Sequence, residues 1–289
     1  MDGYRAAAAI LPRELRPEAE RLTPGEKRRC EEFRLRRGHP PTALIAGRET
    51  TLGQTPVTEA HLRAVLEAAS RSSLHAAEAE LRRGYLSAPG GVRVGVCGVG
   101  VTGEAGPVGL RSFSSLAVRV PHAVPGCADG VWREVTEGGF HSLLVVSPPG
   151  AGKTTLLREL IRRLSEAGER VCVADERGEL AGAGCDFDLG PHTDVMTGIP
   201  KAAAAGMLLR SMNPQIIAMD EIADEAEGEA LLAAVGCGVS LLASAHGDCV
   251  GDARRHPACR RLLDTGAFHT AVTILCAGGI RSYRTEALG

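Results

Sequence analysis

The sequence predicts an α/β protein: a mostly parallel sheet covered by helices in the C-terminal part, preceded by a smaller α+β domain. After Gly139, short apolar runs that suit buried strands alternate with segments of helical periodicity, which is typical of parallel sheets. Before Gly138 the predicted elements are short and mixed. The chain has 289 residues, and 44% of them are hydrophobic, enough for a sizeable core. At ~150 residues per domain, two domains are expected, 1–138 and 139–289.

In the first domain, elements are predicted from local periodicity and turn residues. Thr58 is suited to cap a helix that runs to about Ser70, because Leu62, Val65 and Leu66 recur at helical spacing. The other predicted elements are a short helix over Leu11–Leu22, strands over Glu32–Leu35, Thr42–Ile45 and Phe113–Val120, and a hairpin of Tyr85–Ser87 with Val92–Cys97.

In the second domain, strand and helix patterns alternate. Ser142–Ser147 is an apolar run, and a helix over Thr154–Ala167 follows it and ends at Gly168. Further predicted elements are strands over Arg170–Ala174, Ile216–Met219 and Val239–Ser244, helices over Lys201–Met212 and Glu225–Val235, and a closing hairpin of Ala271–Cys276 with Ile280–Arg284 through Gly278–Gly279.

Composition argues against several classes of protein. The net charge is −2 and aromatics are only 3%, so the chain has neither a global basic field nor many stacking platforms for nucleic acid. The nine cysteines are odd in number and lack C-x-x-C spacing, which favours reduced thiols over a disulfide framework or a zinc site. No run approaches the ~20 apolar residues of a membrane span, so a membrane role is expected only through a partner.

A phosphate-binding loop is predicted between the first strand and helix of the second domain. The run from Ser147 to Thr155 reads S-P-P-G-A-G-K-T-T, with Ser147 where the usual first glycine stands. Glycines let backbone N–H groups turn toward phosphate oxygens, and Lys153 reaches the β- and γ-phosphates. The Thr154 hydroxyl is a Mg²⁺ ligand, and Thr155 hydrogen-bonds the α-phosphate. The alternative is an ordinary strand–turn–helix junction. The predicted nucleotide-binding residues are Pro149, Gly150, Ala151, Gly152, Lys153, Thr154 and Thr155.

Acidic and polar residues follow three other predicted strands. Asp220 and Glu221 end an apolar strand, as in a Walker B motif, where Asp220 holds Mg²⁺ and Glu221 polarises water. Glu176 follows the second strand and is a second candidate for orienting water, while His246 is placed to sense the γ-phosphate. The alternatives are solvated acidic loops and a structural histidine.

The chain resembles the stage III sporulation protein AA family, which is similar to the type II/IV secretion ATPases. The resemblance covers nearly the whole length. In the second domain it rests on P-P-G-A-G-K-T-T-L-L-R at 148–158, D-E-R-G-E-L-A-G at 175–182, T-D-V-M-T-G-I-P-K at 193–201, L-R-S-M-N-P-Q-I-I-A-M-D-E-I at 209–222 and S-A-H-G at 244–247. In the first domain it rests on F-R-L-R-R-G-H-P at 33–40, G-Y-L-S-A-P-G-G-V-R-V-G-V-C-G at 84–98 and S-F-S-S-L-A-V-R-V at 112–120.

The resemblance implies a RecA-like P-loop ATPase domain that uses ATP and Mg²⁺ and assembles into a ring, a hexamer being the expected number. It implies that Arg119, with Arg93 or Arg111 as further candidates, contacts nucleotide, and that Arg210 is a phosphate-site arginine. The implied setting is the mother-cell cytoplasm of an endospore former. There the ring would dock on an integral membrane protein of a channel to the forespore.

Two other functions compete with a secretion-type ATPase. One is a RecA-like motor on nucleic acid, for which a basic cluster provides the only signal. That cluster consists of Lys27, Arg28, Arg29, Arg34, Arg36 and Arg37. Interleaved glutamates favour a solvated surface instead. The other is a slow or non-hydrolytic scaffold, against which Lys153, Asp220 and Glu221 argue.

Overall fold

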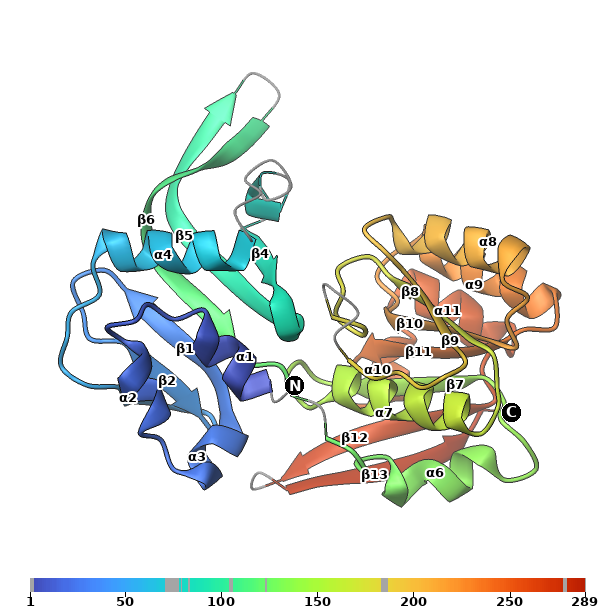
Figure 1. Ribbon diagram of the computed structural model, residues 1–289. Helices are drawn as coiled ribbons and strands as arrows, with labels where there is room; N and C mark the ends of the chain where they lie inside the picture. Colours follow the sequence, from blue (N-terminus) through green and yellow to red (C-terminus); the bar gives the residue numbers. More distant parts are fainter. Residues whose placement is uncertain are drawn as a thin grey trace. The chain divides into compact units, whose positions relative to one another are not determined.

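A computed structural model describes residues 3–70, 78, 80–82, 84–103, 106–122, 124–182, 187–277 and 280–288. The chain forms two compact units, Met1–His122 with Gly182–Asp186, and Ala123–Ala181 with Phe187–Gly289 (Figure 1). The sequence analysis placed the domain boundary at 138/139. The structure groups 124–138 with the second unit, because α6 (Asp129–Thr136) buries Val131 and Val135 in that unit's core.

The first unit is built on a six-stranded antiparallel sheet in the order β3-β2-β1-β6-β5-β4. Its strands are β1 (Cys30–Arg36), β2 (Thr42–Ile45), β3 (Arg48–Thr51), β4 (Tyr85–Ala88), β5 (Val92–Gly103) and β6 (Gly106–Arg119), and its helices include α1 (Gly3–Ala9), α2 (Arg16–Glu20), α3 (Pro24–Arg29), α4 (Glu59–Ser70) and the short η1 (Pro89–Gly91). The predicted strands and the helix after Thr58 are confirmed, and the Thr58 hydroxyl accepts a hydrogen bond from the His61 N–H at 3.2 Å.

The single helix predicted over Leu11–Leu22 is wrong. The chain turns at residues 10–15, and only Arg16–Glu20 is helical. Pro12 and Pro17 explain the difference, because proline has no backbone N–H and is tolerated only in the first turn of a helix. Pro17 lies in that first turn of α2.

The second unit is an α/β structure around a seven-stranded sheet in the order β13-β12-β7-β11-β10-β8-β9. Neighbouring strands pair in parallel from β12 to β9, and only β13 is antiparallel. The strands are β7 (Leu143–Ser147), β8 (Val171–Asp175), β9 (Thr193–Thr197), β10 (Ile216–Glu221), β11 (Ser240–His246), β12 (Thr270–Ala277) and β13 (Ile280–Ala287). The sequence analysis missed β9; the turn predicted at Gly278–Gly279 lies outside the described residues.

Helices cover both faces of this sheet. One face packs against α6 and α7 (Lys153–Glu166), and the other against α8 (Lys201–Ser211), α9 (Glu225–Gly236), α10 (Val250–Ala253) and α11 (Pro257–Asp264). Each buried strand is apolar on both faces, as β7 and β8 show, since both are buried along their whole length. Because the strands from β12 to β9 run parallel, their carboxyl ends meet at one edge of the sheet. Ligands bind at this edge in folds of this kind.

No helix in the described ranges is both long and apolar enough to cross a bilayer. Eight cysteines lie within those ranges, and all are free thiols; Cys185 lies outside them.

Candidate nucleotide-binding site

The loop between β7 and α7 has the curled backbone that the sequence predicts. Gly150 (φ 76°) and Gly152 (φ 111°) adopt left-handed conformations that favour glycine. Gly152 immediately precedes α7, so the positive end of the helix dipole and its first N–H groups point into the loop. Thr154 and Thr155 lie in the first turn of α7 and are half-buried. This geometry suits an anion such as a phosphate group.

Lys153 is the first residue of α7 and is buried. Its Nζ donates hydrogen bonds to the carbonyl oxygens of Ser147 at 2.9 Å and Pro148 at 3.3 Å. Burial lowers the pKa of Lys153, and the nearby charge of Glu221 opposes that shift. The ammonium group therefore rests on the carbonyls at the start of the loop, within the space that the loop encloses.

His246 and Glu221 form a contact chain with Lys153. Strand β11 pairs with β7 so that His246 lies opposite Ser147. Lys153 Nζ lies 2.9 Å from His246 Nδ1, and His246 Nε2 lies 2.8 Å from Glu221 Oε2. Because a protonated lysine can only donate, Nδ1 accepts and the ring proton is on Nε2, which donates to the carboxylate. The structure thus brings together three residues that the sequence analysis singled out separately.

Asp220 is held by Lys201, a residue to which the sequence analysis gave no role. Lys201 Nζ lies 3.3 Å from Asp220 Oδ1 and 3.0 Å from Glu227 Oε1, and it donates to the backbone carbonyl of Glu221. Burial raises the pKa of Asp220 to about 6 even though Lys201 opposes the shift. Burial also disfavours the charge on Lys201, but Asp220 and Glu227 outweigh it, and its pKa is raised. The two carboxylates thus outweigh the effect of burial on Lys201, whereas Lys201 offsets the effect of burial on Asp220 only in part.

Glu176 lies at the same edge of the sheet. It lines an acidic cavity of about 260 Å³ together with Asp220 and Glu221. The other lining residues are Arg177, Glu179, Lys201, Ala223, Asp224 and Glu227. Hard oxygen ligands are those that Mg²⁺ prefers, and the Asp220 carboxylate in this cavity is of that kind. A Mg²⁺ site shared by Asp220 and Thr154 stays a prediction.

The segment that carries Glu176 is anchored by a buried carboxylate and a half-buried guanidinium. The carboxylate of Asp175, which is 1% exposed, accepts hydrogen bonds from the backbone N–H groups of Glu179 (2.7 Å), Leu180 (2.9 Å) and Ala181 (2.8 Å). Arg158 of α7 donates to the carbonyls of Leu180 and Glu179 at 2.8 and 2.6 Å. Both residues lie within the motifs quoted above, but their partners are backbone groups that no side-chain pattern reveals.

The predicted arginines belong to elements other than the phosphate loop, α7 and β10. Arg119 is exposed on β6 of the first unit, opposite Arg93 of β5, whose guanidinium lies 3.9 Å from the Tyr85 ring centroid. Arg210 lies in the last turn of α8, at the other end of that helix from Lys201. The side chain of Arg111 lies outside the described ones. Nucleotide contact by these arginines stays a prediction.

Half of the basic cluster of the first unit is ion-paired. Arg34, Arg36 and Arg37 contact Glu32, Glu49 and Glu59, respectively. Lys27 donates to the carbonyl of Glu20. Cations neutralised in this way favour the solvated surface over a nucleic-acid interface.

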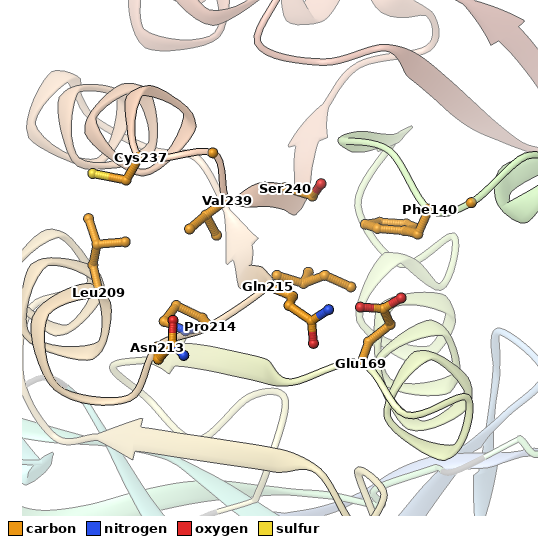
Figure 2. A pocket seen from close by; sticks show the side chains of 12 residues that line it. Phe140, Glu169, Leu209, Asn213, Pro214, Gln215, Cys237, Val239 and Ser240 are labelled. Carbon is orange, nitrogen blue, oxygen red and sulfur yellow. The ribbon is translucent and has the colours of Figure 1, made fainter.

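Two further cavities lie in the second unit. One, of about 210 Å³, adjoins Ala151, Gly152 and Thr155 of the phosphate loop. The other, of about 620 Å³, is lined by Phe140, Glu169 and residues that precede β10 and β11 (Figure 2). These residues lie at the amino ends of the parallel strands, opposite to the edge where His246 and Asp220 lie. The larger cavity is therefore not the nucleotide site.

Solved structures with a similar fold include an ATPase and a pilus retraction motor. The chain is similar to the Legionella pneumophila ATPase DotB (16% identity, TM-score 0.57, 90% of this chain and 77% of that chain). It is also similar to the pilus retraction motor PilT with bound ADP (17% identity, TM-score 0.61, 90% and 79%). At these identities the likeness shows the fold alone, an α/β fold shared with DotB and PilT.

The sequence comparisons show the family. The model of the family "Sporulation stage III, protein AA" matches residues 6–281. Stage III sporulation protein AA of Bacillus subtilis is 33% identical over 284 residues, covering 94% of this chain and 91% of that protein. The chain belongs to this sporulation family. About half of this chain is also similar to the Arabidopsis thaliana protein SEEDLING PLASTID DEVELOPMENT 1. The identity is 33% over 163 residues, which cover 51% of this chain and 22% of that protein.

Proposed function

We propose that the second unit is a RecA-like domain that binds ATP with Mg²⁺ and hydrolyses it. The observation that carries the proposal is the contact chain Lys153–His246–Glu221, which lies beside Asp220 at the carboxyl edge of the sheet. A phosphate-binding lysine, a carboxylate suited to activating water and a polar residue between them are the parts that phosphoryl transfer requires. Family membership and the fold likeness support the same activity.

Each residue has a defined role in this proposal. Backbone N–H groups of the loop bind the phosphates, and Lys153 exchanges its carbonyl partners for the β- and γ-phosphate oxygens. Thr154 and Asp220 would hold Mg²⁺, which neutralises charge on the phosphates when bound. Glu221 orients the attacking water. A γ-phosphate that draws Lys153 away from His246 also frees the histidine to sense it.

Glu176 completes the proposed site. It lines the acidic cavity beside Glu221, and the Asp175 anchor holds its segment there. We assign to it a supporting role in orienting water, and Arg177 in the same cavity is available to a phosphate group.

We further propose that the protein works as a ring, with a hexamer as the expected number, on a channel between mother cell and forespore. It would act from the mother-cell cytoplasm, docked on an integral membrane protein of the channel. Membership of a stage III sporulation family and the likeness to secretion ATPases support this assignment.

Phosphate release by the purified protein tests the proposal, with Lys153→Ala and Glu221→Gln measured in parallel. We expect Mg²⁺-dependent hydrolysis that both variants lose, while Glu221→Gln still binds ATP. Light scattering with and without ATP should show a ring-sized species that ATP promotes.

Two results would change the proposal. Hydrolysis by Glu221→Gln at the wild-type rate would refute the role of Glu221. Wild-type phosphate release no faster than that of Lys153→Ala would favour an ATP-gated scaffold, and adding the membrane partner would separate that function from a silent enzyme.

A further inference from the structure

The small cavity beside the phosphate loop is formed by three separate segments of the second unit. Ala151, Gly152 and Thr155 come from the loop and the first turn of α7, and Leu156 follows them. Val124 and Cys127 come from the segment before α6, and Ile274, Arg281 and Tyr283 from the β12–β13 hairpin. Its volume is about 210 Å³. This is below the ~300 Å³ of pockets that hold whole ligands, so it suits one ring system.

The position of the cavity defines which end of a nucleotide it meets. Glu221 and Asp220 line the acidic cavity, where the γ-phosphate and attacking water are placed. The small cavity instead contacts Thr155, the predicted α-phosphate contact. A triphosphate bound along the loop therefore extends its sugar and base toward the small cavity.

The lining offers apolar surface and an aromatic ring. Val124, Leu156 and Ile274 are apolar, and the Tyr283 ring lies against Gly130 of α6, where an added Cβ would be 3.5 Å from the ring. This backing supports the ring in place. Flat rings stack well on a held aromatic side chain.

The described lining residues include no Asp, Glu, Asn or Gln that would distinguish one purine from another. Arg281 Nε donates to the carbonyl of Ala151 at 2.8 Å, which holds the guanidinium over the loop. The remaining N–H groups of Arg281 are donors, and adenine and guanine share an acceptor at N7.

We propose that this cavity is the base subsite, that Tyr283 provides its stacking surface, and that it accepts purines without strong selection between adenine and guanine. The inference rests on the proposed nucleotide binding at Lys153. It goes further in naming the residues that recognise the base and in predicting that GTP is also a substrate.

Calorimetric titration of the full chain with ATP, GTP, UTP and inorganic triphosphate, each with Mg²⁺, tests the inference. For the wild type we expect ATP and GTP affinities within about fivefold of each other and a weaker affinity for UTP, which offers less stacking area. Tyr283→Leu should weaken ATP and GTP binding about tenfold, because the base loses the aromatic surface on which it stacks. Triphosphate binding should not change, and that result also shows that the variant is folded.

Three further variants sharpen the test. Tyr283→Phe keeps the ring and should bind ATP like the wild type. Val124→Trp, at a position that is 46% exposed, should obstruct the cavity and weaken ATP binding while sparing triphosphate. Phe140→Leu removes a ring from the larger cavity at the opposite edge of the sheet and should change nothing.

Unchanged ATP affinity in Tyr283→Leu, or a wild-type preference for ATP over GTP of a hundredfold or more, would overturn the inference and leave the proposed function standing. A wild-type protein that binds neither ATP nor triphosphate would overturn both.

Discussion

Asp175→Asn should loosen the segment that carries Glu176. Asp175 is buried, and its two carboxylate oxygens accept three backbone N–H groups, those of Glu179, Leu180 and Ala181. An amide has only one acceptor oxygen. If that oxygen faces Leu180 and Ala181, the new NH₂ group opposes the Glu179 N–H and leaves it without an acceptor.

The expected cost follows from these bonds. One charge-assisted hydrogen bond is lost, the two that remain become neutral, and a buried donor is left unsatisfied at ~1–3 kcal/mol. Burial raises the pKa of Asp175, so removing its charge recovers part of the loss. We therefore expect local opening of residues 175–181 to become easier by ~2 kcal/mol. Since 1.4 kcal/mol is a factor of ten, amide exchange should accelerate about thirtyfold.

Native-state hydrogen exchange measured on peptides that cover residues 176–181 is the assay. Asp194→Asn is the matched control, because Asp194 is exposed on β9. If the proposed function holds, Asp175→Asn should also slow hydrolysis, because Glu176 loses its fixed position. Exchange of these amides at the wild-type rate would refute the assignment of Asp175 as the anchor.

Three other predictions follow from burial and backbone geometry. The folded-state pKa of Asp220, about 6, lies above its ordinary value, so the folded protein favours the protonated carboxyl. The stability that Asp220 contributes is therefore complete below pH ~4 and is lost as pH rises through 6. In metal-free buffer the stability of Asp220→Asn relative to wild type should thus rise between pH 4 and 7, by ~3 kcal/mol at most; parallel curves of unfolding free energy would contradict this. Gly190→Ala places a Cβ 2.6 Å from a side-chain carbon of α7. It should lower the free energy of unfolding by ~2 kcal/mol more than Gly168→Ala, where φ is also positive but space is open. Urea unfolding of the two variants would show the difference. Iodoacetamide at pH 8 should alkylate exposed Cys237 but spare Cys172 until urea unfolds the chain, because burial raises the pKa of the Cys172 thiol to about 11. Equal labelling of the two cysteine peptides in the folded protein, measured by mass spectrometry, would contradict this prediction.

The parts of the site that are local in sequence could be predicted. Gly150, Gly152 and Lys153 stand between an apolar run and a helical pattern, and each of these features depends on neighbouring residues. Asp220 and Glu221 likewise follow directly from the strand they end. The helix predicted over Leu11–Leu22 is wrong because Pro12 and Pro17 interrupt that stretch, and only Arg16–Glu20 is helical.

The sequence by itself determined the alternation of strands and helices, the phosphate loop and the identity of the acidic residues, because each depends on interactions within a few residues. Only the tertiary structure decided which distant groups meet. His246 reaches Lys153 across 93 residues because β7 and β11 are neighbours, and Arg281 reaches Ala151 across 130 because the β12–β13 hairpin lies beside β7. Lys201 pairs with Asp220 of β10 and Glu227 of α9, which only the folded chain brings together. Pairings of this kind are set by strand order and the need to compensate buried charge, and no local pattern in the chain records them.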